Sequence, residues 1–288
     1  MTNTCIQLST PLDTRIAESL AHLAELFQKE NVSYFLLGAT ARDIIFHHVA
    51  GCDASPRRTF DIDISIQMDS WESYNTVRES MLLAGYACSD ESHPEKLIDT
   101  TTNMEIDMLP FGNISENGES IVWPTDSSSW SIVGFNEAYR NAIAHDLGSS
   151  TLRIATPASM IYLKMIAVYD RPEARRKKDS VDIFYTIQNY DRVATKLVSG
   201  SRKRYQLALE ETEGDLLLAN ALIAGNDIRQ MAEKNTPNRI LEILKVETES
   251  ASRCEIAHEL RACLDGNFTR ARAVLRMLKQ GVEGIKRL

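Results

Sequence analysis

Two aspartates stand inside a run of residues that is otherwise typical of a β-strand. In "TFDIDISI", Asp61 and Asp63 are separated only by Ile62. Because side chains alternate between the two faces of a sheet, the isoleucines are predicted to face the core and both aspartates the other side. Their carboxylates would lie about 6.5–7 Å apart and repel each other unless a cation lies between them. An amphipathic strand whose polar face meets water is the alternative.

A second acidic strand is predicted in "NMEIDMLPFG", residues 103–112. Alternation places Glu105 and Asp107 on one side of this strand, opposite two apolar residues. Carboxylate oxygens converging on one point form the type of site that magnesium prefers. Asp107 is therefore predicted as the third metal ligand, and Glu105 is the less favoured substitute. Another amphipathic strand edge is the alternative here as well.

A glycine separates a predicted strand at 33–38 from a predicted helix at 39–51. Gly38 would let backbone N–H groups approach an anion, and the positive end of the helix would point to the same place. Thr40 would add a hydroxyl. A glycine that merely ends a strand is the alternative.

The remaining patterns predict an α+β first half and an all-helical second half. Helices are expected at 13–29, with Asp13 as N-cap, and at 70–85, 157–170 and 173–190; strands are expected at 96–99, 104–109, 120–123, 141–147 and 151–156. The rest of the chain shows helical patterns with breaks near 200, 212, 226, 236, 249 and 266. We predict two domains, 1–156 and 157–288.

The predicted helix 157–170 is apolar on nearly every side, so it is expected to be buried. Lys164 is the one charge in its middle. A buried ammonium is costly without an anionic partner, which predicts contact with a triphosphate or an active-site carboxylate. The alternative is that the long side chain extends to water.

A basic stretch follows this helix in a chain of net charge −8. It contains five cationic residues, Arg171, Arg175, Arg176, Lys177 and Lys178, and "SRKR" at 201–204 is a second basic group. A local basic rim on an acidic protein favours a phosphate backbone as partner. Helix-face salt bridges from this stretch to Asp179 and Asp182 are the alternative.

Composition excludes several classes of protein. No apolar run approaches the ~20 residues of a membrane span, and the first residues lack the layout of a secretory signal, so a cytoplasmic location is expected. The five cysteines are scattered without CxxC spacing, which indicates neither a disulfide framework nor a zinc knuckle.

The order "LLGATARD", "TFDIDISI", "MEIDMLPFG" resembles the DNA polymerase β-like nucleotidyltransferase superfamily. The resemblance implies a small mixed β-sheet flanked by helices. It also implies that Asp61, Asp63 and Asp107 bind Mg²⁺ or Mn²⁺ and that a glycine turn holds the phosphates of an NTP. We assign nucleotide binding to Gly38, Ala39, Thr40, Arg42 and Arg58. Many members have Gly-Ser or Gly-Gly where this chain has Gly38-Ala39, so a serine contact is either missing or supplied by Thr40.

The later residues are similar to the AbiEii-type nucleotidyltransferase toxins of abortive-infection systems. The matching positions are Lys164, Arg171, Lys178, Asp179 and Asp182, with Lys178 in place of the family's arginine. The resemblance implies that Lys164 neutralises the triphosphate and that Asp179 and Asp182 support Lys164 or the acceptor.

These observations predict a metal-dependent nucleotidyltransferase that moves an NMP from an NTP to an acceptor and releases pyrophosphate. An RNA end such as that of transfer RNA is the favoured acceptor, and the protein would belong to a toxin–antitoxin pair with a cognate partner. The alternatives are an antitoxin that modifies a partner protein and a nucleotidyltransferase acting on a small molecule. A non-catalytic nucleotide-binding protein is the alternative from another class, against which the three retained aspartates weigh.

Overall fold

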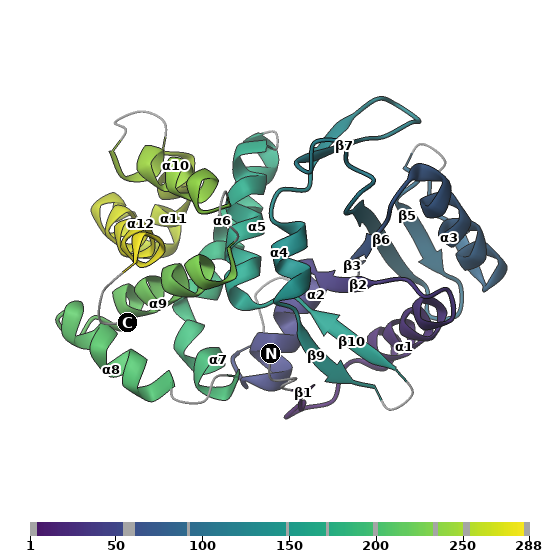
Figure 1. Cartoon of the computed structure of the whole chain (residues 1–288). Coiled ribbons are helices and arrows are strands. Elements are labelled where there is room, and N and C mark those ends of the chain that lie inside the picture. The colour runs from purple at the N-terminus through teal and green to yellow at the C-terminus, as the bar shows by residue number, and fades with distance from the viewer. Residues whose placement is uncertain are drawn as a thin grey trace. The chain divides into compact units, whose positions relative to one another are not determined.

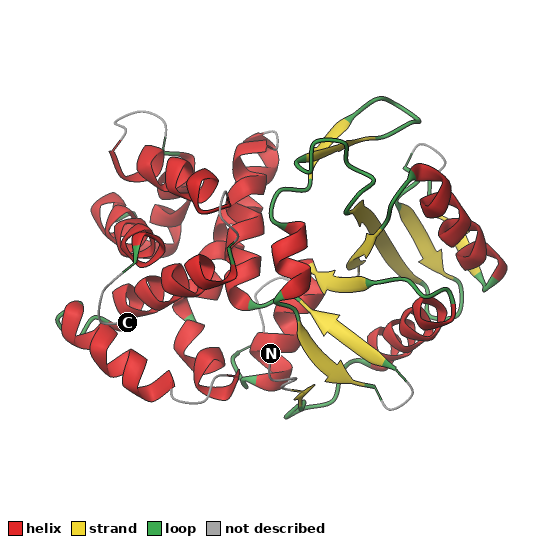
Figure 2. Ribbon diagram, in the orientation of Figure 1, coloured by secondary structure: helices red, strands yellow, loops and turns green. Residues whose placement is uncertain are grey.

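The chain forms two compact units, Met1–Thr156 and Pro157–Leu288, in this computed structural model (Figure 1). The structure describes residues 5–53, 61–90, 93–147, 150–170, 173–197, 201–232, 236–249 and 254–284. The first unit combines a sheet with helices, whereas the described part of the second unit is helical (Figure 2). The predicted α+β fold class with a helical C-terminal region is confirmed.

The first unit is built on a mixed sheet of eight strands in the order β1-β9-β10-β2-β3-β6-β5-β4. The strands are β1 Cys5–Ile6, β2 Tyr34–Leu37, β3 Asp61–Gln67, β4 Tyr86–Cys88, β5 Lys96–Asp99, β6 Met104–Phe111, β9 Ile143–Asp146 and β10 Thr151–Ile154. A separate pair is formed by β7 Ser120–Val122 and β8 Ser129–Ser131. The sequence analysis did not predict β1, β4 or β8, each of which has only two or three residues.

The register of the central strands places the acidic residues side by side. Strand β3 runs parallel to β6, with Asp61 opposite Glu105 and Asp63 opposite Asp107. On the other face of this pair, the side chain of Ile62 and its apolar neighbours on both strands are fully buried, as alternation predicted. The polar face therefore carries carboxylates from both strands at the same height.

Helices of the first unit begin where their capping residues stand. Helix α1, Thr14–Lys29, begins after Asp13, whose side chain accepts a hydrogen bond from the Arg15 N–H. Helix α3, Trp71–Leu83, begins with a capping box between Ser70 and Ser73. The short helix α4, Phe135–Arg140, was not predicted.

The helix predicted at 39–51 is divided. Helix α2, Gly38–Asp43, continues into a π-helix at Ile44–Val49, in which the hydrogen bonds span one residue more than in an α-helix. The helical path is as expected, and its widened second half is a feature that residue spacing did not reveal.

The second unit consists of helices whose breaks largely follow the predicted positions. They are α5 Pro157–Asp170, α6 Glu173–Gln188, α7 Tyr190–Leu197, α8 Ser201–Glu211, α9 Leu216–Met231, α10 Thr236–Glu249, α11 Glu255–Leu260 with the 3₁₀ turn Arg261–Leu264, and α12 Phe268–Glu283. None of the described helices is long and apolar enough to cross a membrane.

The break predicted near residue 226 is wrong, because α9 continues through Gly225 and Asn226. A Cβ atom on Gly225 would lie 2.1 Å from the backbone oxygen of Leu278 in α12, and one on Gly281 would lie 2.2 Å from that of Leu222. The glycine lets two helices pack closely rather than ending one of them.

Candidate active site

Three carboxylates converge on the polar face of the sheet. One oxygen each from Asp61, Asp63 and Asp107 lies within 4.8 Å of the others, and all three side chains are half-buried. In the part of the chain that the structure describes, no other group of three His, Cys, Asp or Glu side chains meets this criterion. Carboxylate oxygens are the donors that hard divalent cations such as Mg²⁺ and Mn²⁺ prefer. The arrangement therefore fits a divalent metal.

The electrostatics of the group favour a bound cation. Like charges at this separation oppose simultaneous ionisation, and a positive charge nearby relieves that opposition. Burial raises the pKa of Asp107, Lys96 lowers it, and the net result is a pKa above the usual aspartate value. Glu105 and Asp61 raise the pKa of Asp107 further by their negative charge.

Lys96 is a residue of this face that sequence analysis missed. It lies on β5 directly opposite Asp107 on β6. Its Nζ donates hydrogen bonds to Glu105 and, at 3.2 Å, to Oδ1 of Asp107. Burial lowers the pKa of Lys96, but the two carboxylates outweigh that effect and hold the pKa above its usual value. A strand was predicted at 96–99, yet its register against β6 could not be read from the sequence.

The glycine turn lies against the acidic pair. Gly38 has φ +71°, and a Cβ atom there would lie 1.8 Å from Oδ2 of Asp63. Both the left-handed backbone and the close approach of the carboxylate require glycine at this position. Ala39 beside it is buried.

Thr40 fixes the turn to the strand that carries the aspartates. Its hydroxyl donates a hydrogen bond of 2.8 Å to the backbone oxygen of Asp61, and the side chain is buried. The hydroxyl proton that the sequence assigned to a phosphate is thus used within the protein. Thr40 positions α2 against β3.

Arg42 and Arg58 are the two arginines that the sequence analysis assigned to nucleotide binding. Arg42 is buried and donates from Nε and from a terminal nitrogen to Oδ1 of Asp43, at 3.0 and 2.8 Å. Arg58 lies outside the described residues.

The second unit contains an acidic pair of another kind. Nζ of Lys164 on α5 lies 2.9 Å from Oδ1 of Asp179 and 2.8 Å from Oδ2 of Asp182, both on α6. The lysine side chain is 19% exposed and the carboxylates are 1% and 4% exposed. Burial lowers the pKa of Lys164, but the charges of Asp182 and Asp179 outweigh it and raise the pKa above its usual value.

The basic stretch is partly paired. Arg176 lies 3.2 Å from Glu255, whereas Lys177 and Lys178 are exposed on α6. Arg171 and the side chain of Arg175 lie outside the described residues.

The second basic group is divided in the same way. Arg204 is bound to Asp227 at 2.6 Å, and Arg202 and Lys203 are exposed.

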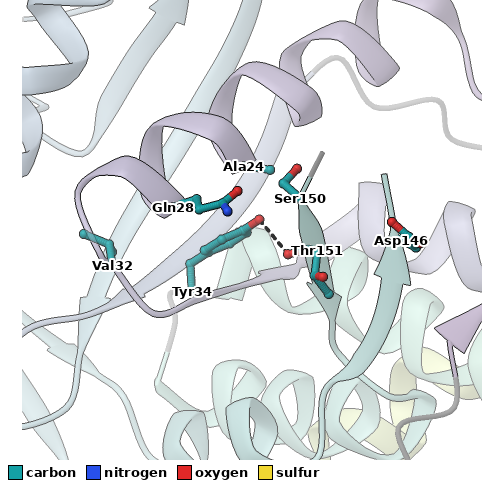
Figure 3. Close-up of a pocket in the computed structure, with 7 residues that line it drawn as sticks. All are labelled: Ala24, Gln28, Val32, Tyr34, Asp146, Ser150 and Thr151. Atoms are coloured by element: carbon teal, nitrogen blue, oxygen red, sulfur yellow. Dashed lines mark hydrogen bonds between the residues drawn. The ribbon is translucent and has the colours of Figure 1, made fainter. Parts of the chain in front are cut away.

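A cavity of about 330 Å³ lies between α1 and the β9–β10 hairpin (Figure 3). The hydroxyl of Tyr34 lines it and donates to the backbone oxygen of Thr151 at 3.0 Å, and burial raises the pKa of Tyr34 to about 12. Tyr34 begins β2, whereas Leu37, at the other end of that strand, is paired with Asp63. The cavity is therefore separate from the carboxylate group.

No known family model and no curated protein matches the sequence. Among solved structures, similarity is found to an antigenic nucleotidyltransferase-like protein from Paracoccidioides brasiliensis, with 16% identity, 73% of this chain and 95% of the other covered, and a TM-score of 0.41. The antibiotic-resistance factor ANT(2'')-Ia gives 12% identity, coverage of 71% and 100%, and a TM-score of 0.36. A CCA-adding enzyme solved with ATP gives 12% identity, coverage of 93% and 80%, and a TM-score of 0.26. These neighbours are nucleotidyltransferases, and they are too distant to assign this chain to a family.

Proposed function

We propose that the protein is a divalent-metal-dependent nucleotidyltransferase that transfers an NMP from an NTP to an acceptor and releases pyrophosphate. The observation that carries the proposal is the convergence of Asp61, Asp63 and Asp107 across two parallel strands, with oxygens within 4.8 Å of one another. Gly38, whose backbone lies against Asp63, supports it.

Each residue of the site has a part in the proposed reaction. Asp61, Asp63 and Asp107 would hold the metal, which when bound neutralises phosphate charge and lowers the pKa of the acceptor hydroxyl. Asp107 is also the residue that we assign to accept the proton of the attacking hydroxyl, and Lys96, which contacts its Oδ1, orients the carboxylate. The acceptor oxygen then forms its bond to the α-phosphorus as the bond to pyrophosphate breaks.

We also propose that Lys164 neutralises the triphosphate while it stays paired with two carboxylates. Its ammonium is already balanced by Asp179 and Asp182. A phosphate would share this cation with two carboxylates, so we assign Asp179 and Asp182 the task of holding the lysine in place.

An RNA end is the proposed acceptor, in a protein that acts as one member of a toxin–antitoxin pair. Lys177 and Lys178 support the RNA proposal, because both are exposed on one helix of a chain with net charge −8. Lys177→Ala with Lys178→Ala should weaken acceptor use and flatten its salt dependence, while NTP binding is unchanged. Transfer with an unchanged salt slope would remove this support.

Labelled NTPs test the reaction itself. The purified protein is incubated with each labelled NTP, Mg²⁺ and cell extract, and incorporation into RNA, protein and small molecules is measured. Asp61→Asn with Asp63→Asn should abolish incorporation and leave the fold intact, because removing clustered like charges relieves repulsion. Glu116→Gln with Glu119→Gln makes the same change of charge at exposed positions and should keep full activity. Equal incorporation by both double variants would refute the proposed function.

A further inference from the structure

Lys96 is placed where it acts on the metal ligands without being one of them. Its ammonium contacts two acidic side chains that stand two residues apart on β6, Glu105 and Asp107. By register, these two lie opposite Asp61 and Asp63, and of the two it is Asp107 whose oxygen converges with theirs in the structure. The sequence left that choice open, and Lys96 is the residue in contact with both candidates.

Lys96 contacts both carboxylates through its one Nζ. It donates a hydrogen bond to Oε1 of Glu105 and one of 3.2 Å to Oδ1 of Asp107. Glu105 is thereby held by the lysine, while Oδ2 of Asp107 is not part of this contact. The pairing separates one carboxylate that is held in an ion pair from one that can also bind a metal.

We propose that Lys96 is a positioning residue of the metal site that keeps Glu105 out of the ligand set and lowers the affinity for a divalent cation until nucleotide phosphates bind. The inference rests on the proposed function, because it assumes that Asp107 is a metal ligand. A cation held by Asp107 would be near the ammonium that contacts the same carboxylate, and like charges repel. Phosphates bring negative charge that offsets this repulsion, so metal and nucleotide bind together.

A Mn²⁺ titration without nucleotide, followed by electron paramagnetic resonance, tests the proposal. Lys96→Met should bind Mn²⁺ about tenfold more tightly than the natural protein, which corresponds to about 1.4 kcal/mol. Lys96→Arg keeps the charge and should restore the natural affinity. Lys29→Met is the matched control, since Lys29 is the other lysine of the first unit and is exposed, and its affinity should not change. Unchanged or weaker binding by Lys96→Met would overturn the proposal.

The choice of ligand is tested with Asp107→Asn in the same assay. This substitution should weaken Mn²⁺ binding less in the Lys96→Met background than in the natural protein, because Glu105 is then free to replace the lost ligand. An equal loss in both backgrounds would contradict the assigned role. If Lys96→Met unfolds in EDTA, refolding on addition of Mn²⁺ would support the proposal, and failure to refold would contradict it.

The outcomes separate this proposal from the proposed function. Natural protein that binds no Mn²⁺ at the aspartates would refute the metal site itself. A different result would refute only the role of the lysine: Asp61→Asn with Asp63→Asn abolishes Mn²⁺ binding, but Lys96→Met binds Mn²⁺ with the same affinity as the natural protein.

Discussion

The two units each contain a pair of aspartates close in sequence, and the two pairs have opposite surroundings. Asp61 and Asp63 lie on a strand, half-buried, with an oxygen of Asp107 within 4.8 Å. Asp179 and Asp182 lie on a helix, almost fully buried, with the ammonium of Lys164 within 3 Å of both. In the first group two carboxylates meet a third, which Lys96 contacts through Oδ1, whereas in the second group one ammonium contacts both carboxylates.

This difference shows why spacing alone does not identify a metal site. Both pairs satisfy a simple acidic pattern, one at i and i+2 and the other at i and i+3. Three converging carboxylates, of which Lys96 contacts Asp107, keep negative charge that can hold a divalent cation, whereas the buried pair that brackets Lys164 exceeds its lysine by a single negative charge. We therefore predict that changes in the first group affect mainly metal binding and transfer, and that changes at Lys164 lower stability as well as NTP affinity.

Removal of Lys164 is expected to have the largest effect on stability. Lys164→Met removes the ammonium that lies between two buried carboxylates and should lower the free energy of unfolding by about 3–5 kcal/mol. Chemical denaturation measures the change, and Lys203→Met at an exposed position should shift it by less than about 0.5 kcal/mol. Natural stability in Lys164→Met would show that the two clusters do not differ as described.

Substitution of Gly38 should have the next largest effect. Alanine at Gly38 combines an unfavourable positive φ with a direct clash against Asp63, so it should cost more than about 2 kcal/mol and reduce transfer. Gly51→Ala is a matched control, because Gly51 has φ +68° and open space around its Cβ position. It should cost only about 1–2 kcal/mol and retain activity. If both variants show the same loss of stability and full transfer, the contact with Asp63 has no functional importance.

The smallest effect is expected at Ser65, the next residue on the same face of β3. Ser65 is fully buried, and its hydroxyl donates to the backbone oxygen of Leu109 at 2.7 Å. Ser65→Ala should lower the free energy of unfolding by about 1 kcal/mol and leave Mn²⁺ affinity unchanged. A change in affinity would mean that the metal site extends farther along the strand than the three carboxylates.

The acidic face could be predicted from the sequence because it depends on the alternation of side chains within single strands. Alternation in β3 and β6 gave the side on which Asp61, Asp63 and Asp107 lie, and Gly38 marked the turn beside them. Lys96 was missed because its contact with Asp107 depends on the register of β5 against β6, which connects residues through strand pairing rather than spacing.

The helical unit was harder to predict from the sequence, because its contacts join separate helices. Gly225 looked like a helix break, but it is required where α9 and α12 approach closely. The sequence correctly indicated that Lys164 needs an anionic partner. The identity of the partners, Asp179 and Asp182, depends on how α5 packs on α6.

The most direct test of the account is the binding of Mn²⁺ to the natural protein and to Asp61→Asn with Asp63→Asn. The natural protein should bind the ion, and the double variant should lose affinity by more than about a hundredfold, since even outer-shell partners of metal ligands cost about 10–100-fold when mutated. The double variant Glu116→Gln with Glu119→Gln should bind as the natural protein does. If the aspartate double variant binds Mn²⁺ with natural affinity, the converging carboxylates are not the metal site.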